Sequence, residues 1–254
     1  VSFDDEEIDK ERGVIIEEWR LGRGAGARMR DKQYPVLFHQ SRYAERLPIG
    51  KKEVLDSFGH ETLRAFYRDW YRPDLMAVIV VGDVEVRNVR ALIEQHFGSM
   101  QSRSGAPQRT LYPVPDYPHT LFAVASDSEA TSTNVGVYVK LPVRSQATVG
   151  DYRLSLVEQL YSSMLNERLQ ELTKKPDPPF LYAFAGKGRF VRTTEMAILN
   201  AGVRNNGVEQ GLEALLTESA RVRQHGFTAT ELDRARRSLL RSLEAAYQER
   251  DKQE

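Results

Sequence analysis

The feature that most constrains the fold is an alternation of apolar and polar residues near the middle of the chain. Val135, Val137, Val139 and Leu141 recur at every second position, which is the period of a β-strand. Such a strand places one face on a core and the other nearer water. Helical patterns flank it on both sides, and we therefore expect an α+β fold with helices packed against a largely antiparallel sheet.

Turn residues and apolar periodicity divide the second part of the chain into further elements. Thr228 and Glu231 stand at capping-box spacing and open the last helix. The predicted strands are residues 120–125, 133–141, 180–188 and 194–203, and the predicted helices are residues 147–172, 208–224 and 230–249.

The first part is predicted to be helical with one strand. The strand, Leu75 to Val81, is an unbroken apolar run, which indicates burial on both faces. The predicted helices are residues 5–21, 51–70 and 84–97, and an irregular segment continues from the first helix through Gly50. In that segment the run Arg20 to Arg30, interrupted by three glycines, is predicted to be a flexible loop.

Ser, Gly, Gln and four prolines gather between Ser99 and Pro118, a composition typical of a linker. We expect a first domain at residues 1–100, a linker at 101–118 and a second α+β domain at 119–254.

Composition narrows the class of function. The charges balance, with 36 basic and 36 acidic residues, so no nucleic-acid partner is implied. There are no cysteines, which excludes disulfides and thiolate metal sites. No run of eighteen apolar residues occurs, so no membrane span is expected in these residues.

Two carboxylates in the first helix carry the chemical prediction. Glu11 and Glu18 are seven residues apart and share a stripe with Ile8 and Ile15, which predicts acids in a buried seam. Two helical turns separate the carboxylates by roughly 10 Å, too far for both to bind one metal ion directly. The alternative is a solvated acidic helix that begins at residues 4–7.

Four motifs in one order resemble the pitrilysin and insulinase family of zinc metallopeptidases. They are an Glu-Arg-x-x-Val helix with a second glutamate (Glu11 to Glu18), the turn Pro48-Ile49-Gly50, the segment Phe66-Tyr67-Arg68-Asp69-Trp70-Tyr71-Arg72-Pro73, and a strand that ends Val81-Gly82-Asp83. The longer turn from Ser41 to Gly50 is most similar to large bacterial members that join two homologous halves. The resemblance implies a pitrilysin-like fold in both domains, with residues 1–100 as the C-terminal portion of the catalytic domain.

The resemblance also implies the site. Glu18 matches the third zinc ligand, and Glu11 matches a helper carboxylate behind the ligands. The family's other two ligands are histidines of a His-x-x-Glu-His motif on an earlier helix. No two of the five histidines are four residues apart, as that motif requires. The pair most similar to part of the motif is His60-Glu61, which we interpret as ordinary protein surface.

The resemblance therefore implies a fragment that lies downstream of its own metal motif. We expect Zn²⁺ in the intact parent and none bound to the fragment. We also expect the first domain to lack strands, so that its open edge favours dimerisation or swapping. Large bacterial relatives are commonly exported, which implies a periplasmic location.

The segment that contains Arg168 and Tyr182 echoes an arginine-led helix and a tyrosine-bearing strand of the family, and we interpret both residues as architectural. The function implied is that of a fragment, inactive alone, of a metalloendopeptidase that encloses unfolded peptides between two halves of the parent chain. A non-catalytic scaffold of the same fold is the alternative. A free-standing peptide-binding module is disfavoured because strands are missing.

Overall fold

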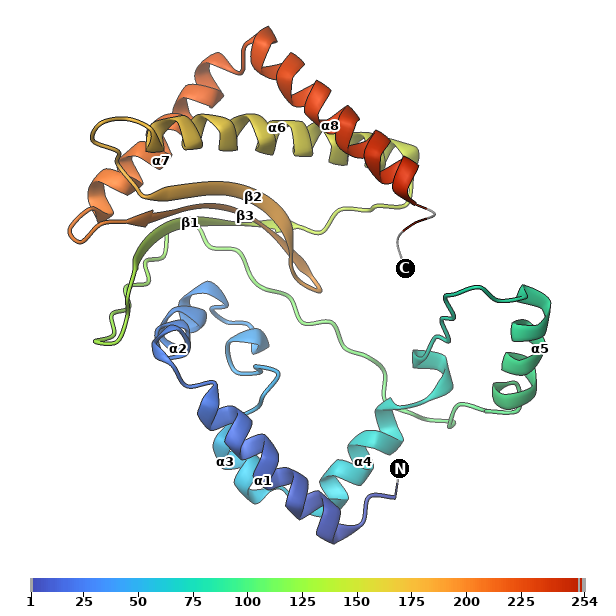
Figure 1. Cartoon of the computed structure of the whole chain (residues 1–254). Coiled ribbons are helices and arrows are strands. Elements are labelled where there is room, and N and C mark those ends of the chain that lie inside the picture. Colours follow the sequence, from blue (N-terminus) through green and yellow to red (C-terminus); the bar gives the residue numbers. More distant parts are fainter. Residues whose placement is uncertain (1, 251, 253–254) are drawn as a thin grey trace. The chain divides into compact units, whose positions relative to one another are not determined.

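The computed structural model describes residues 2–250 and 252. The chain divides into two compact units that meet between Tyr112 and Pro113 (Figure 1). Each unit has its own set of elements and is described separately below.

The described residues of the first unit form helices and connecting segments. The α-helices are α1 (Asp5–Leu21), α2 (Ala25–Leu37), α3 (Lys52–Ser57), α4 (His60–Trp70) and α5 (Val86–Phe97), and the 3-10 helices are η1 (Arg42–Ala44) and η2 (Pro73–Leu75). The predicted helices at residues 5–21 and 84–97 are confirmed, the second beginning two residues later than expected.

Two predictions about the helices of this unit were wrong. The segment after α1 is not a loop, because Gly22 ends α1, Gly24 precedes the first residue of α2, and strong helix formers such as Ala25, Ala27 and Met29 then outweigh Gly26. The predicted helix at residues 51–70 is two helices. Phe58 adopts an extended conformation between them, and Gly59 precedes α4.

The strand predicted from Leu75 to Val81 is not formed. Residues 76–81 have no regular structure, and Ile79 and Val81 are 82% and 91% exposed. A strand is stable only when its backbone N–H and C=O groups pair with a neighbour. No strand occurs in the described part of this unit, so the apolar run has nothing to pair with.

The second unit contains an antiparallel sheet of three strands. They are β1 (Thr133–Pro142), β2 (Tyr182–Val191) and β3 (Thr194–Val203), in the order β1-β3-β2. β3 pairs with both neighbours along its length, and its middle residue pairs link Leu199 to Val137 and to Ala185. The predicted strand at residues 120–125 is not formed, because these residues have no regular structure and pair with none of the three strands.

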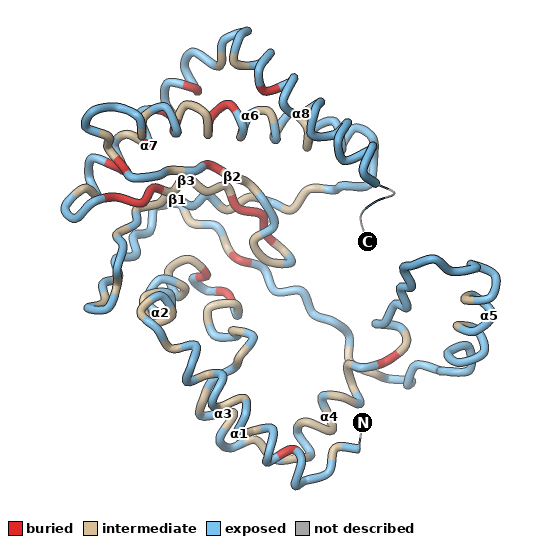
Figure 2. Tube along the Cα trace, in the orientation of Figure 1, coloured by how far each residue is buried: buried red, intermediate tan, exposed pale blue. Residues whose placement is uncertain are grey.

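Three helices lie on one face of this sheet (Figure 1). α6 (Val149–Thr173) contacts β2, α7 (Val208–His225) contacts β3 and β1, and α8 (Ala229–Glu249) packs on α6. A core lies between them, and Figure 2 colours its buried residues red, together with the buried residues of the first unit. This core consists of Leu165, Leu169, Phe180, Ala185, Ala201, Val203, Leu215 and Val222. The predicted class, helices packed on an antiparallel sheet, is confirmed in this unit.

Tyr182 ties the three strands together. Gly202 in β3 lies opposite Tyr182 in β2 and opposite Asn134 in β1. The tyrosine ring lies over Gly202, where a Cβ atom would overlap the ring. Its hydroxyl hydrogen-bonds Asn134 Oδ1 at 2.7 Å. These contacts support the architectural interpretation of Tyr182.

Candidate metal-binding helix

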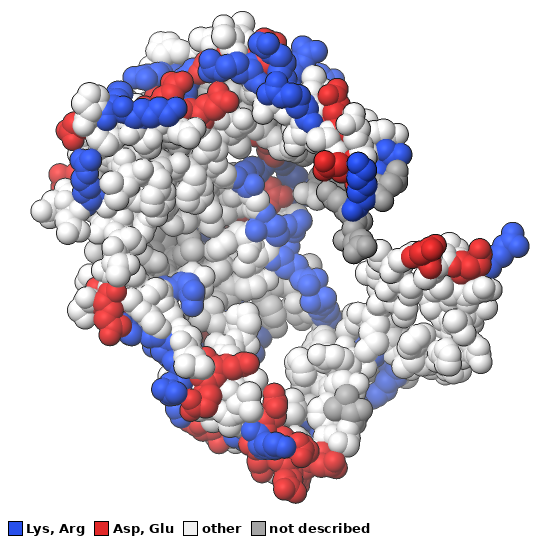
Figure 3. Space-filling model, in the orientation of Figure 1, with Lys and Arg blue, Asp and Glu red and all other residues white. Residues whose placement is uncertain are grey.

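Helix α1 begins with a concentration of negative charge. Asp5, Glu6 and Glu7 occupy its first turn, and Asp4 precedes them. Figure 3 shows acidic side chains gathered at this end of the helix. Carboxylates in a first turn stabilise a helix because they interact favourably with the unpaired backbone N–H groups and with the helix dipole.

The buried face of α1 is not the face that carries the two predicted site residues. Ile8 is buried, and Arg12, Ile15, Ile16 and Trp19 are half-buried, whereas Glu11 and Glu18 are exposed. At 100° per residue, the two glutamates point about 80–100° away from the centre of the buried face. The prediction that both acids lie in a buried seam was therefore wrong.

Arg12 fixes α1 to the junction between α3 and α4. Its Nη1 donates to the backbone carbonyl of Leu55 at 2.5 Å, and its Nη2 donates to the carbonyl of Phe58 at 3.0 Å. The guanidinium also lies 4.0 Å from the centre of the Phe58 ring. Carbonyls at a helix end lack partners within the helix, so Arg12 satisfies the end of α3 from a neighbouring helix.

His60 links the first residue of α4 to the beginning of α1. Its ring nitrogens lie 3.2 Å from an Asp5 carboxylate oxygen and 2.9 Å from an Asp9 carboxylate oxygen. The hydrogen bond from His60 is the main cause that holds the Asp9 pKa below its ordinary value, with Arg12 adding to it. The sequence did not predict this structural role of His60 between α4 and α1. Only the fold reveals these contacts, because His60 lies 51 residues from Asp9.

Glu18 and Glu11 have no such contacts. Neither side chain makes a hydrogen bond or an ion pair with the residues that the structure describes, whereas their neighbour Glu17 pairs with Arg20 at 2.8 Å. Carboxylate oxygens that are exposed and unpaired are available as metal ligands. Over residues 2–250 and 252, however, no group of three or more His, Cys, Asp or Glu side chains is placed to hold a metal ion. Glu18 could thus contribute one ligand, and the residues described do not complete a zinc site.

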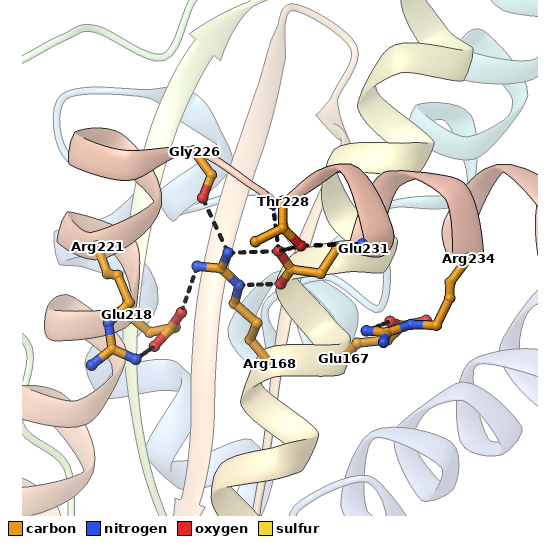
Figure 4. Close-up of polar contacts among 8 residues, drawn as sticks. All are labelled: Glu167, Arg168, Glu218, Arg221, Gly226, Thr228, Glu231 and Arg234. Atoms are coloured by element: carbon orange, nitrogen blue, oxygen red, sulfur yellow. Dashed lines mark hydrogen bonds and ion pairs between the residues drawn. The ribbon is translucent and has the colours of Figure 1, made fainter.

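Arg168 joins three helices in the second unit (Figure 4). From α6 it donates through Nε and Nη2 to both carboxylate oxygens of Glu231 on α8, at 2.5 and 2.9 Å. Its Nη1 donates to Glu218 on α7 at 3.1 Å, and Nη2 also donates to the Gly226 carbonyl at 3.1 Å. Glu231 closes the capping box of α8 with Thr228. Every donor group is directed at the protein, which supports the architectural interpretation of Arg168.

The Arg168 pairing changes the acidity of its partner. Hydrogen bonds from Arg168, and then from Thr228, lower the pKa of Glu231 to about 2, although burial acts in the opposite direction. The Glu218 side chain is only 3% exposed and receives a second partner, Arg221, at 3.0 Å. The cluster therefore favours the charged form of Glu231 and pairs Glu218 with two guanidinium groups.

A second group of charges lines a cavity of about 560 Å³ between α6 and the β2–β3 hairpin. Lys187 pairs with Glu158 at 2.7 Å and with Glu195 at 3.3 Å, and Arg144 pairs with Glu158. Burial disfavours the charged form of Glu158, yet the bonds from Lys187 and Arg144 keep its pKa below the ordinary value. These charged side chains pair with one another and link α6, β2 and β3, which is typical of a structural network of ion pairs.

Comparison with known proteins places this fold. The family profile described as the peptidase M16 inactive domain matches residues 57–239. The chain belongs to the peptidase M16 family. This membership confirms the resemblance to the pitrilysin group that the sequence motifs indicate.

Named M16 relatives are similar over nearly the whole chain. It is 35% identical to an Arabidopsis thaliana protein called zinc protease PQQL-like, over 97% of this chain and 23% of that protein. It is 30% identical to the probable zinc protease PqqL of Escherichia coli, over 96% of this chain and 26% of that protein. The chain thus spans about a quarter of the length of these relatives.

The solved structures agree. The crystal structure of the periplasmic protease PqqL from Escherichia coli matches with a TM-score of 0.88 at 27% identity, covering 100% of this chain and 28% of that one. The structure of the first half of the same protease matches equally well, and there the covered share is 54%. In PqqL of Escherichia coli, the matched region therefore lies within the first half of the protease. Among the described helices, none has the length and apolar character needed to cross a membrane.

Proposed function

We propose that residues 1–254 are part of a zinc-dependent metalloendopeptidase and that Glu18 is one of its metal ligands. Zinc supplies such enzymes with an activated water that attacks a peptide carbonyl. In this proposal Glu18 provides one carboxylate oxygen, and Glu11 orients the ligand set through hydrogen bonds to it. The two histidine ligands and the general base come from residues outside this chain.

The observation that carries the proposal is the state of Glu18. It is exposed and unpaired among the described residues, on a helix that Arg12, about 120° away around the helix axis, fixes to the α3–α4 junction. The named relatives in the M16 family are zinc proteases. A second ligand at Glu11 is disfavoured because seven residues of helix separate the carboxylates by roughly 10 Å.

The test measures zinc stoichiometry and peptide hydrolysis in the full-length protein for wild type, Glu18→Gln and the matched control Glu17→Gln. Both variants remove one negative charge from neighbouring exposed positions of α1. We expect Glu18→Gln to lose zinc and activity and Glu17→Gln to keep both. For Glu11→Gln we expect zinc binding weakened by about 10- to 100-fold, the range for residues that support metal ligands. A Glu18→Gln protein that retains one zinc per chain refutes the assignment.

We also propose that residues 1–254 alone bind no zinc and hydrolyse no peptide, because one carboxylate does not make a catalytic zinc site. The purified chain titrated with Zn²⁺ should show no saturable site. Saturable binding that depends on Glu18 would contradict this.

A non-catalytic scaffold of the same fold is the second candidate. The family profile that matches residues 57–239 is that of the inactive domain, and the exposure of Glu11 and Glu18 removes the burial cost that would disfavour idle acids at these positions. In a scaffold both Glu18→Gln and Glu17→Gln leave the full-length protein unchanged in metal content, and no peptide is hydrolysed.

We further propose that the partners are the other half of the parent chain and unfolded peptide substrates, and that the protein is periplasmic, as PqqL of Escherichia coli is. The apolar run at residues 76–81 supports pairing with additional chain, because it is exposed and unpaired within the described part of its unit. In residues 1–254 alone, the same run would favour dimerisation. Fractionation of cells and the mass of the purified chain in solution test these two points.

A further inference from the structure

We propose that Arg12 is a positioning residue for the metal ligand, fixing the rotation of α1 about its axis and so the direction in which Glu18 points. This inference rests on the assignment of Glu18 as a zinc ligand. Arg12 itself touches no metal or substrate in this proposal.

The contacts along α1 single out Arg12. The beginning of the helix is linked to α4 by Asp5 and Asp9, both of which pair with His60. Arg12 follows, with its bonds to Leu55 and Phe58. Beyond Arg12, the side-chain hydrogen bonds and ion pairs of α1 in the described residues stay on α1 itself, as in the Arg20–Glu17 pair, and the Trp19 ring contacts the guanidinium of Arg23 just after the helix. Arg12 is therefore the last polar link between α1 and the α3–α4 junction before Glu18.

The geometry of Arg12 resists rotation. Two bonds to carbonyls of different residues and a stack on the Phe58 ring fix the guanidinium in position and in plane. Its side chain is only 15% exposed, so water competes weakly for these bonds. A planar guanidinium with several donors can hold two carbonyls at once, whereas the single ammonium of lysine cannot reproduce this fork.

The tolerance of a metal site shows why such a restraint matters. A helix with its side chains has a radius of about 5–6 Å, so a rotation of about 10° moves a side-chain tip by about 1 Å. Metal–ligand distances are held within about 0.2 Å, which corresponds to a rotation of about 2°. Apolar contacts of Ile15 and Trp19, both half-buried, restrain rotation less sharply because they have no preferred direction.

The test compares Arg12→Met and Arg12→Lys with the matched control Arg20→Met in the full-length protein. Arg20 lies on the same helix, is 66% exposed and pairs only with Glu17 among the described residues. Zinc dissociation constants are measured by chelator competition, and hydrogen exchange of α1 is followed in the metal-free protein. We expect Arg12→Met to raise the zinc dissociation constant about 10- to 100-fold and to accelerate exchange in α1, with KM for a peptide within twofold of wild type. Arg20→Met should match wild type in all three.

Arg12→Lys keeps the charge and serves if Arg12→Met does not fold. We expect it to bind zinc more weakly than wild type by a smaller factor, since it restores one bond of the fork and not the stack. Wild-type zinc affinity in a folded Arg12→Met or Arg12→Lys protein overturns the inference. A Glu18→Gln protein that keeps its zinc instead overturns the proposed function, so the two failures are distinguishable.

Discussion

Replacement of Arg168 by methionine should destabilise the second unit by ~3 kcal/mol at pH 7. At about 1.4 kcal/mol per pKa unit, the fall of the Glu231 pKa from 4.5 to about 2 corresponds to ~3 kcal/mol in favour of the folded, ionised state, of which Arg168 supplies the largest part and the hydrogen bonds from Thr228 a smaller part. Loss of one partner from a buried ion pair typically costs about 3–5 kcal/mol. The lower end applies here because Glu218 keeps its bond to Arg221.

The same reasoning fixes the pH dependence. Because the Glu231 pKa is lower in the folded chain than in the unfolded chain, its stabilisation is complete above about pH 5. It then decreases as the pH falls toward 2. The difference in free energy of unfolding between wild type and Arg168→Met should therefore shrink from ~3 kcal/mol at pH 7 to about 1 kcal/mol at pH 3.

Urea unfolding followed by far-UV circular dichroism at both pH values measures this difference. Hydrogen exchange in α6, α7 and α8 then assigns the loss to the second unit, since both tryptophans, Trp19 and Trp70, report on the first unit. The matched control is Arg234→Met, which breaks the half-exposed α8–α6 pair with Glu167 at 3.4 Å. It should cost less than about 1 kcal/mol. An Arg168→Met cost below about 1 kcal/mol at pH 7, or one that is equal at pH 7 and pH 3, refutes the argument.

Two other changes test packing and pairing. Gly202→Ala should destabilise the sheet by about 1–2 kcal/mol, because the new methyl group displaces the Tyr182 ring and breaks its bond to Asn134; a double-mutant cycle with Tyr182→Ala should be clearly non-additive, and additive costs would count against the ring contact. Ile79→Lys should reduce self-association of residues 1–254 in analytical ultracentrifugation, since it places a charge in the exposed run, which is 82% exposed at Ile79; an unchanged sedimentation profile would exclude that run as the contact.

The sequence predicted well those helices and strands whose stabilising partners lie in the same unit of the chain. β3 was predicted at residues 194–203 and is found there, because both of its partners lie within the same unit. α8 begins where Thr228 and Glu231 form their predicted capping box. Local signals suffice when the contacts that stabilise them are present in the same chain.

The missed features depend on contacts that are distant in sequence. The guanidinium of Arg12 binds carbonyls 43 and 46 residues away. Because every residue has a backbone carbonyl, the residue types at those positions do not reveal the contact. His60 gave no signal either, since a lone His-Glu pair is common on protein surfaces. The motif that contains Arg12 was recognised from the sequence, but its arginine was not assigned a role.

Glu11 and Glu18 are exposed, although the spacing along the sequence predicted that they would be buried. A stripe at i, i+3, i+7 and i+10 drifts by about 80° from its first to its last residue on a straight helix, so Ile8 can face the core while Glu18 faces water. Burial therefore cannot account for the two acids. In the M16 fold, what distinguishes Glu18 from the other exposed acid beside it is that Glu17 pairs with Arg20 and Glu18 has no partner among the described residues. The proposed ligand role accounts for an exposed carboxylate that has no partner among the described residues, and the contrast between Glu18→Gln and Glu17→Gln tests that role directly.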